Sequence, residues 1–355
     1  MAKIAFLSFY SGPVERGVEN FVFELTKRLK SKHQITIFQA GQKILNTDIR
    51  TYKIGFFASA PKSSGSLLPK LYLDWHSIRI LIFTVLSLPK IIKGKYQVII
   101  PVNGGWQTVI IRLFSKLTVS KMIISGHAGI GADDAWNIFF RPDIFVALTS
   151  SQYKWAKKIA PEIQIAHIPN GVDLAKFNPS VKAKKISLKK PIVICVSALV
   201  PYKRIDLTIK AIAKTKNLSL LILGNGQLSG LLDTLGKRLL KKRYLRLNPT
   251  YEQIPSYYRS ANVFTLVSKT EAFGISYLEA MACNLPVVAT NDASREEIIG
   301  NAGILTDPTN QNQYAKDLTI ASQTNYRNIP YDQSLKFSWN KITQSYSEII
   351  KQLTK

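Results

Sequence analysis

Short apolar runs alternate with amphipathic stretches along the chain, a pattern typical of a parallel β-sheet flanked by helices. Helical spacing is clearest in residues 17–29, where Phe21, Leu25 and Leu29 fall on one face. The first half contains strand-like runs at 3–9, 34–39, 97–101, 121–125 and 144–148, and a further helical stretch at 106–117. These elements predict a doubly wound α/β domain.

A second series of the same kind begins near residue 192. Its expected strands are 192–197, 219–223, 262–267 and 287–289, and its expected helices include 205–214 and 275–282. Between the two series, residues 178–191 contain five lysines and few large apolar residues, which is the composition of a linker. We therefore expect an α/β fold with two Rossmann-like domains, residues 1–180 and 181–336, facing across a cleft.

The most hydrophobic segment, residues 67–92, is interrupted by charged residues and Pro89, so we do not expect it to span a membrane. Its apolar positions recur at helical spacing, and lysines follow at 90, 93 and 95. A helix packed into the core is favoured, and a helix lying in the membrane interface is the alternative. The apolar run near the N-terminus is too short for a signal peptide. We expect a cytoplasmic protein, with a peripheral position at the inner face of the membrane as the alternative.

Composition and charge narrow the class further. Of the 355 residues, 46% are hydrophobic, which excludes disorder as the main state, and Cys195 and Cys283 are too few for a disulfide framework or a thiolate metal site. Lys and Arg number 48 against 22 Asp and Glu, a net charge of +26. No nucleic-acid-binding module is recognisable, so the charge favours an anionic substrate or an anionic membrane surface, and no nucleic acid is expected as a partner.

The most informative segment runs from Ser268 to Ala282. Gly274 lets the backbone approach a ligand where a helix begins near Ile275, and the unpaired N–H groups of a first helical turn suit a diphosphate. Glu271 precedes the helix and Glu279 lies in its second turn, so one carboxylate can reach a group ahead of the diphosphate while the other accepts from ligand hydroxyls. This arrangement suits a sugar nucleotide. A helix cap and a solvated face remain the ordinary alternative for two such glutamates.

Glu271 and Glu279, with Phe273 and Gly274 between them, resemble the E-x7-E signature of the family-four glycosyltransferases, which have the GT-B fold. Further resembling segments are 168–173, 196–206, 220–226, 286–290, 301–308 and 337–339, so the resemblance covers nearly the whole chain. It implies an N-terminal acceptor-binding domain and a C-terminal donor-binding domain. It also implies that the last helix, about 337–355, packs back on the first domain.

The resemblance assigns roles to particular residues. Lys203 corresponds to a ligand of the donor phosphates, where an ammonium would stabilise the leaving group, although one lysine among many is otherwise a surface residue. Family members commonly have an arginine where this chain has Ala198, and Arg204 is the candidate substitute. Gly17 corresponds to one of two glycines that approach the diphosphate, and Arg16 replaces the other; loop flexibility is the alternative role of Gly17.

His127 follows a predicted strand, where several family members have a histidine beside the donor sugar. The resemblance implies that it positions a sugar hydroxyl rather than acting as a base. The implied catalytic residues are His127, Lys203 and Glu271, and the implied donor-binding residues are Gly17, Arg204, Phe273, Gly274, Ile275 and Glu279. No metal site and no cofactor besides the nucleotide-sugar are expected.

The implied activity is transfer of a hexosyl group from a UDP- or GDP-sugar to an acceptor hydroxyl, with retention of configuration. The acceptor would be a carbohydrate, a glycolipid or a lipid-linked glycan of the cell envelope. The loop near Asn248 and Tyr251, expected to contact the base, does not distinguish UDP from GDP. A dinucleotide-dependent oxidoreductase lacks support, because no G-x-G-x-x-G follows the first strand. A sugar-nucleotide epimerase of the same fold and a non-catalytic protein that binds anionic polymers or lipids remain alternatives.

Overall fold

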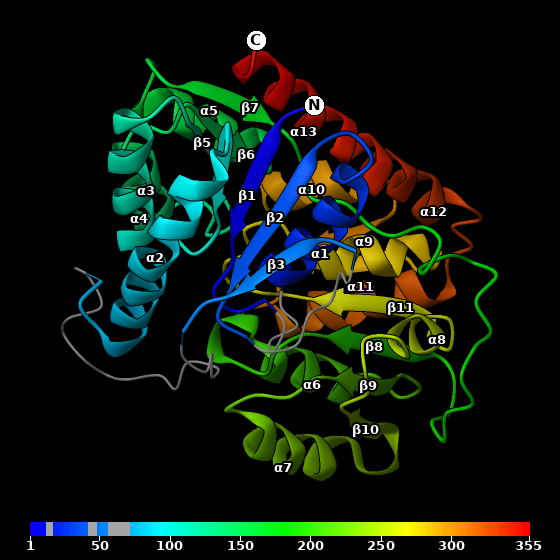
Figure 1. Cartoon of the computed structure of the whole chain (residues 1–355). Coiled ribbons are helices and arrows are strands. Elements are labelled where there is room, and N and C mark those ends of the chain that lie inside the picture. The colour runs from blue at the N-terminus through cyan, green and yellow to red at the C-terminus, as the bar shows by residue number, and fades with distance from the viewer. Residues whose placement is uncertain (12–16, 42–47, 56–71) are drawn as a thin grey trace. The chain divides into compact units, whose positions relative to one another are not determined.

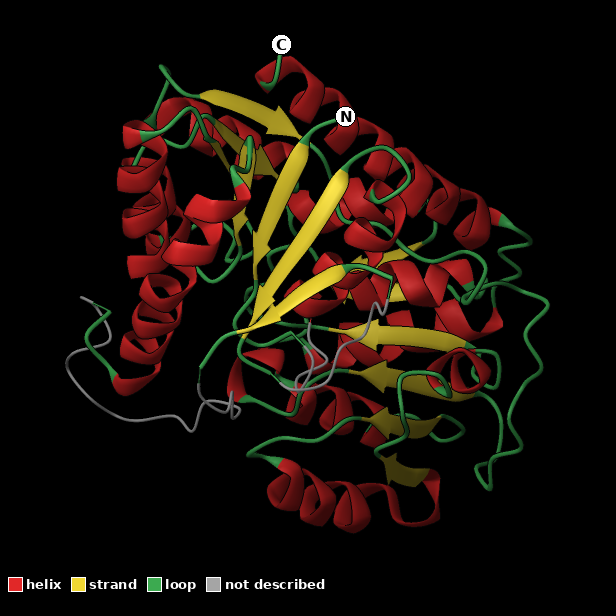
Figure 2. Ribbon diagram, viewed as in Figure 1, coloured by secondary structure: helices red, strands yellow, loops and turns green. Residues whose placement is uncertain are grey.

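The computed structural model describes residues 1–11, 17–41, 48–55 and 72–355, and these form two compact units. The first unit comprises residues 1–170 and 339–355, and the second comprises residues 171–338. Each unit contains one parallel β-sheet with helices packed against it (Figures 1 and 2). Arg16 and the first part of the hydrophobic segment, residues 67–71, lie outside the described residues.

The sheet of the first unit has the order β3-β2-β1-β4-β5-β6-β7, and every pair is parallel. Its strands are β1 (Lys3–Leu7), β2 (Gln34–Gln39), β3 (Arg50–Lys53), β4 (Val98–Pro101), β5 (Lys121–Ser125), β6 (Ile144–Ala147) and β7 (Gln164–His167). Its helices are α1 (Gly17–Leu29), α2 (Trp75–Gly94), α3 (Trp106–Leu117), α4 (Ala132–Phe139), α5 (Ser150–Ile159) and α13 (Trp339–Leu353). The strand order reverses beside β1, because β1 pairs with both β2 and β4.

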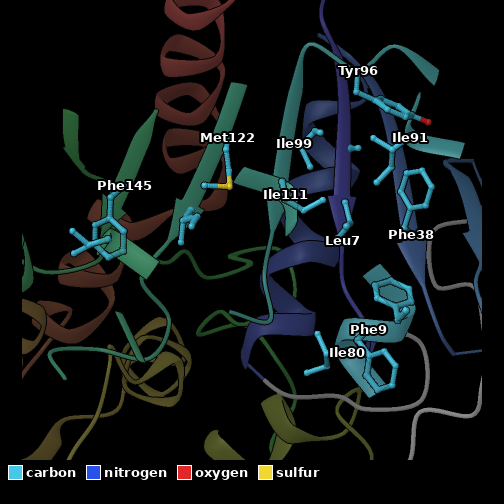
Figure 3. Packing of buried hydrophobic residues seen from close by; sticks show 14 of the residues in the cluster. Leu7, Phe9, Phe38, Ile80, Ile91, Tyr96, Ile99, Ile111, Met122 and Phe145 are labelled. Atoms are coloured by element: carbon cyan, nitrogen blue, oxygen red, sulfur yellow. The ribbon is translucent and has the colours of Figure 1, made fainter. Parts of the chain in front are cut away.

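Alternate residues of β1 enter two separate cores, as the period of a β-strand requires. Phe6 lies on the face covered by α1 and α13, where it packs with Phe21 and Tyr346. Leu7 lies on the opposite face, which α2, α3 and α5 cover. Figure 3 shows this second core, in which Leu7 and Ile111 point into the same layer. Both faces of the sheet are therefore buried, and its carboxyl edge is left to the loops.

The second unit repeats the plan with the order β10-β9-β8-β11-β12-β13, again parallel throughout. Its strands are β8 (Ile192–Val196), β9 (Ser219–Leu223), β10 (Tyr244–Leu247), β11 (Val263–Leu266), β12 (Val287–Thr290) and β13 (Gly303–Thr306). Its α-helices are α6 (Ile205–Ala213), α7 (Ser229–Leu240), α8 (Ile254–Tyr258), α9 (Ile275–Ala282), α10 (Ala293–Ile299), α11 (Gln311–Gln323) and α12 (Ile329–Ser334), and its 3-10 helices are η2 (Pro201–Lys203), η3 (Lys241–Arg243) and η4 (Leu335–Phe337). The strand order reverses beside β8, which pairs with β9 and β11.

Candidate functional site

The loops after β8 and β11 lie at the point where the strand order of the second unit reverses. In open α/β sheets, ligands bind beyond the carboxyl ends of the strands at such a point. The loop after β8 ends in the 3-10 turn η2, and Arg204 then adopts a left-handed conformation with φ 50° before α6 begins. The loop after β11 leads to α9. Most of the residues expected to bind the donor lie on these two loops.

Lys203 and Glu271 meet although they come from different loops. The Lys203 Nζ donates to Glu271 Oε2 at 2.5 Å, and the same oxygen accepts from Ser268 Oγ at 3.1 Å. The two side chains of the ion pair are 12% and 16% exposed. A cation and a carboxylate with open lone pairs are thus presented together at the carboxyl edge of the sheet.

Arg204 fixes the loop after β11. Its Nε donates to the Val267 carbonyl at 2.7 Å, and its Nη2 donates to the Ser268 carbonyl at 3.2 Å and to Thr290 Oγ1 at 3.1 Å. Burial, followed by the charge of Arg295, lowers the pKa of Arg204. These contacts explain how the loop that carries Glu271 is held. A role for Arg204 in place of the arginine missing at Ala198 stays a prediction.

Gly274 begins α9 in a backbone conformation that a side chain would not allow. Its φ is 87°, and a Cβ at this position would lie 2.3 Å from the Tyr277 ring and 3.2 Å from Glu271 Cγ. Glycine is therefore required for Glu271 and the helix start to lie this close together. The first N–H groups of α9 follow immediately, and such groups lack partners within the helix.

Phe273 and Ile275 flank this glycine in different surroundings. The Phe273 side chain is buried and packs edge-on against Phe337, with ring centroids 6.0 Å apart. Ile275 is half-buried at the first position of α9. The Phe273 ring is therefore part of the core, which leaves its backbone as the part that can contact a ligand.

Glu279 is buried beneath two tyrosine hydroxyls. Its Oε1 accepts from Tyr251 at 2.7 Å and its Oε2 accepts from Tyr258 at 3.2 Å. Burial raises the pKa of Glu279 to about 7, and the two tyrosine hydrogen bonds oppose that rise without cancelling it. A carboxyl group of this kind is half-protonated at neutral pH, and each of its oxygens retains a lone pair for a further donor.

Tyr251 is held in place from the other side. Lys176 Nζ lies 3.6 Å from the centroid of the Tyr251 ring, and the Phe177 ring packs at 5.7 Å. Sequence reasoning placed Tyr251 in the base-contacting loop but did not link it to Glu279. Tyr258 and Lys176 were missed, because they carry no motif and are brought to this place only by the fold.

The two expected site residues of the first unit lie at the carboxyl edge of its own sheet. Gly17 is the first residue of α1 and is exposed. His127 follows β5 and packs against the Phe21 ring at 4.4 Å, and its Nε2 is buried without a hydrogen-bond partner among the described residues. Burial lowers the pKa of His127 to about 4, so its ring is neutral at neutral pH. A neutral imidazole suits positioning of a hydroxyl better than charge stabilisation.

The fold and this site define a GT-B protein with a donor-type second unit. Over its full length the chain is similar to sucrose-phosphate synthase from Thermosynechococcus elongatus, with a TM-score of 0.80, 19% identity and coverage of 100% of this chain and 99% of that one. It is also similar to Anabaena Alr3699/HepE, whose crystal structure contains UDP and glucose, with a TM-score of 0.73, 18% identity and coverage of 99% and 100%. The GT-B fold expected from the sequence is confirmed.

Residues 177–330 match the model of the family described as glycosyl transferases group 1, and the chain belongs to this family through that region. It is 30% identical over 178 residues to the GDP-mannose-dependent alpha-(1-6)-phosphatidylinositol monomannoside mannosyltransferase of Mycolicibacterium smegmatis, covering 44% of this chain and 46% of the relative. The chain spans about half the length of the curated relatives it matches.

Proposed function

We propose that this protein transfers a hexosyl group from a nucleotide-sugar, bound by the second unit, to an acceptor hydroxyl bound by the first, with retention of configuration and without a metal ion. The family of residues 177–330 supports glycosyl transfer. The pairing of Lys203 with Glu271 beside the Gly274 helix start is the observation that carries the proposal. GDP-mannose and UDP-glucose are the donors to test first, given the names of the relatives and the structures similar to this chain.

Each group of the pair has a chemical task in this proposal. The Lys203 ammonium and the N–H groups at the start of α9 would stabilise the negative charge that develops on the leaving diphosphate. Glu271, anchored by Ser268 and adjacent to the ammonium, would accept from a hydroxyl of the donor sugar and fix its orientation. Neither task requires a metal, because the charge is met by a lysine and backbone dipoles.

Glu279 would bind the ribose hydroxyls of the same donor. Its buried position with tyrosine donors on both oxygens keeps the carboxyl group in one orientation, and hydroxyls of a ribose are suitable partners for the remaining lone pairs. Tyr251, clasped between Lys176 and Glu279, would lie against the nucleoside. This division assigns the sugar to Glu271 and the nucleoside to Glu279.

Product analysis tests the proposal directly. The full chain is incubated with carbon-13-labelled GDP-mannose or UDP-glucose and with glycolipid or glycan acceptors, and products are followed by NMR. We expect a new glycosidic bond whose anomeric configuration equals that of the donor, with the same rate in the presence of EDTA. An inverted configuration or a rate that EDTA abolishes would contradict those parts of the proposal. An epimerised nucleotide-sugar without transfer would replace the proposal with the epimerase alternative.

We further propose that the protein acts at an anionic membrane surface on a lipid-linked acceptor, which places it at the inner face of the membrane. The supporting feature is α2. Its inner face packs into the unit through Ile80, Phe83 and Ile91, whereas apolar residues on its outer face are exposed: Trp75, Ile82, Val85, Leu86 and Ile92. Lys90, Lys93 and Lys95 are exposed at its C-terminal end. Apolar side chains beside lysines complement an anionic lipid surface.

Within the part of the chain that the structure describes, α2 is the one helix long and apolar enough to cross a membrane, which by itself is weak evidence. In its most hydrophobic 18-residue window, 28% of the residues are buried in the protein. Because the inner face belongs to the core of the first unit, the packing favours a helix lying along a membrane over one crossing it.

A further inference from the structure

A cavity of about 380 Å³ lies in the first unit, beyond the carboxyl ends of β4 and β5. Its walls come from the start of α2, the loop between β4 and α3, and the segment from β5 to α4. The volume is within the range of small-molecule pockets, roughly 300 to 1,000 Å³. The cavity lies close to the reversal of strand order in this sheet, which is the usual ligand position in open α/β folds.

The walls of this cavity differ in charge from the rest of the protein. The chain carries a net +26, yet the described lining residues include the three carboxyl groups of Asp74, Asp133 and Asp134 and neither lysine nor arginine. Two histidines also line it, and burial lowers the pKa of both His76 and His127. The walls are therefore neutral or negative, and a phosphate bound there would face carboxylates without a compensating cation.

Two of the carboxyl groups are engaged by the protein itself. Asp74 caps α2, with its Oδ1 accepting from the backbone N–H groups of His76 at 3.0 Å and Ser77 at 3.2 Å. Asp134 is 1% exposed, and its Oδ2 accepts from the Gly129 N–H at 2.9 Å and from Gln152 Nε2 at 2.9 Å. These two shape the walls. Asp133 is the carboxylate left to meet a ligand.

Asp133 and Trp106 offer opposite hydrogen-bonding groups to the cavity. Asp133 is exposed and accepts from the Tyr72 hydroxyl at 2.7 Å, which leaves further lone pairs on the carboxylate. The Trp106 Nε1–H, which can only donate, is buried without a partner among the described residues. A ligand hydroxyl donates and accepts, so a hydroxyl-rich ligand satisfies both groups. A fully ionised phosphate only accepts and cannot satisfy Asp133.

Aromatic rings supply the apolar part of the wall. Tyr72 packs against Trp136 at 5.0 Å, Trp136 packs against Trp106 at 6.2 Å, and Trp136 Nε1 donates to the Gly105 carbonyl at 3.0 Å. The rings are thus fixed by one another and by the backbone. Rigid aromatic side chains beside a carboxylate and an indole N–H suit a ring with C–H groups on its face and hydroxyls at its edge.

We propose that this cavity binds the acceptor through an uncharged, hydroxyl-rich ring, a pyranoside or a cyclitol, and discriminates against a phosphorylated ring at the same position. The proposal rests on the proposed glycosyl transfer, whose acceptor it specifies. In it, Asp133 accepts from ring hydroxyls, Trp106 donates to one of them, and any phosphate of the acceptor lies outside the cavity.

The test uses the full chain and two soluble probes, methyl α-D-mannopyranoside and mannose 6-phosphate. Binding is measured by saturation-transfer NMR, which needs no turnover. We expect the neutral pyranoside to bind at least ten-fold more tightly than the phosphate. Trp106→Phe removes the N–H donor and keeps an apolar ring, and should weaken pyranoside binding about ten-fold. Trp155→Phe, a matched change on α5 outside the cavity lining, should leave binding unchanged.

A charge change gives the second arm. Asp133→Lys should weaken the pyranoside and reduce or reverse the preference over mannose 6-phosphate, whereas Glu162→Lys, the same charge change at an exposed position outside the lining, should not. Thermal melting of each variant checks that it is folded. Equal or tighter binding of the phosphate by the unaltered protein, no binding of either probe, or unchanged affinity in the Trp106 variant would overturn the proposal.

Titration of the same samples with GDP and UDP separates this proposal from the proposed function. Pyranoside binding without nucleotide binding would leave the cavity assignment intact and remove the support for a donor site. Nucleotide binding without pyranoside binding would do the reverse.

Discussion

Lys203 Nζ lies 2.5 Å from Glu271 Oε2, although 68 residues separate the two in the sequence. The loops after β8 and β11 bring them together, because these strands are neighbours in the parallel sheet. Both side chains are mostly shielded from solvent. A partly shielded cation beside a carboxylate, next to a glycine-opened helix start, is the arrangement on which the proposed donor site depends.

Lys203→Ala should weaken binding of the diphosphate and spare the nucleoside. Loss of a charge-assisted contact predicts a dissociation constant for GDP or UDP that is about 10- to 100-fold higher, with guanosine or uridine unaffected. Calorimetry of the full chain measures both. Lys210→Ala is the matched control, since Lys210 forms an exposed ion pair with Asp206 on α6 and such pairs contribute little. Equal losses for diphosphate and nucleoside would refute a phosphate contact.

Glu271→Gln should reduce turnover and leave nucleotide binding nearly intact. The amide keeps the size of the side chain but loses the charge and one acceptor, so the donor sugar would be poorly oriented and kcat should fall by about two to three orders of magnitude. Steady-state kinetics with the identified donor gives kcat, and calorimetry gives the nucleotide affinity. A variant with the rate of the unaltered protein would remove Glu271 from the site.

Glu279 should make the folded state less stable as the pH rises. Its pKa is raised by burial from 4.5 to about 7, so between these values the unfolded chain releases a proton that the folded chain retains. The resulting cost is absent below pH 4.5 and complete above pH 7. Glu279→Gln lacks this ionisation, so its stability relative to the unaltered protein should increase from pH 5 to pH 8 by ~1 to 3 kcal/mol.

Chemical denaturation at the two pH values measures this difference. Glu296→Gln, at an exposed carboxylate on α10, is the control and should show no such change. The contribution of other titrating groups cancels because they are common to both proteins. A Glu279→Gln difference that is constant with pH would show that the carboxyl group titrates normally.

Gly274→Ala should destabilise the second unit and abolish donor binding. A Cβ there meets the Tyr277 ring at 2.3 Å, and the φ of 87° is unfavourable for alanine, so a cost of about 1 to 3 kcal/mol is expected. Gly230→Ala, in the first turn of α7, is the matched change, because nothing lies within 4 Å of its Cβ. It should be neutral or slightly stabilising. Equal melting temperatures for both variants would contradict the described helix start.

Removing apolar side chains from the outer face of α2 should weaken membrane binding. Leu86→Ser combined with Ile92→Ser should lower affinity for phosphatidylglycerol vesicles at least ten-fold, since each side chain contributes roughly 1 kcal/mol or more when buried in lipid. Vesicle co-sedimentation at several salt concentrations provides the measurement. Leu231→Ser, at an exposed leucine of the second unit, is the control. Unchanged binding of the α2 variant would assign the surface elsewhere.

The sequence predicted the elements whose hydrophobic period is strong. Helices α1, α3 and α9 and strands β2, β5 and β9 have the expected bounds, because each has a regular apolar face and a clear end signal. The sheet-edge strands β3, β7, β10 and β13 were missed. They are four residues long and partly exposed, so they carry too few apolar residues to stand out.

The candidate site was predictable only where a motif carries it. Glu271, Gly274 and Glu279 lie within one loop and helix, so their spacing predicted that they would act together. The ion pair with Lys203, the burial of Glu279 by Tyr251 and Tyr258, and the clasp by Lys176 depend on contacts between distant segments. The acidic cavity of the first unit was not predicted, since its lining residues are spread over several loops without a common pattern.

A crystal structure of the full chain with an intact nucleotide-sugar tests the central claim most directly. The account predicts diphosphate oxygens at about 3 Å from Lys203 Nζ and from N–H groups at the start of α9, with Glu271 accepting from a sugar hydroxyl. A nucleotide-sugar bound elsewhere, with the ion pair between Lys203 and Glu271 unchanged and without contact to the ligand, would contradict it.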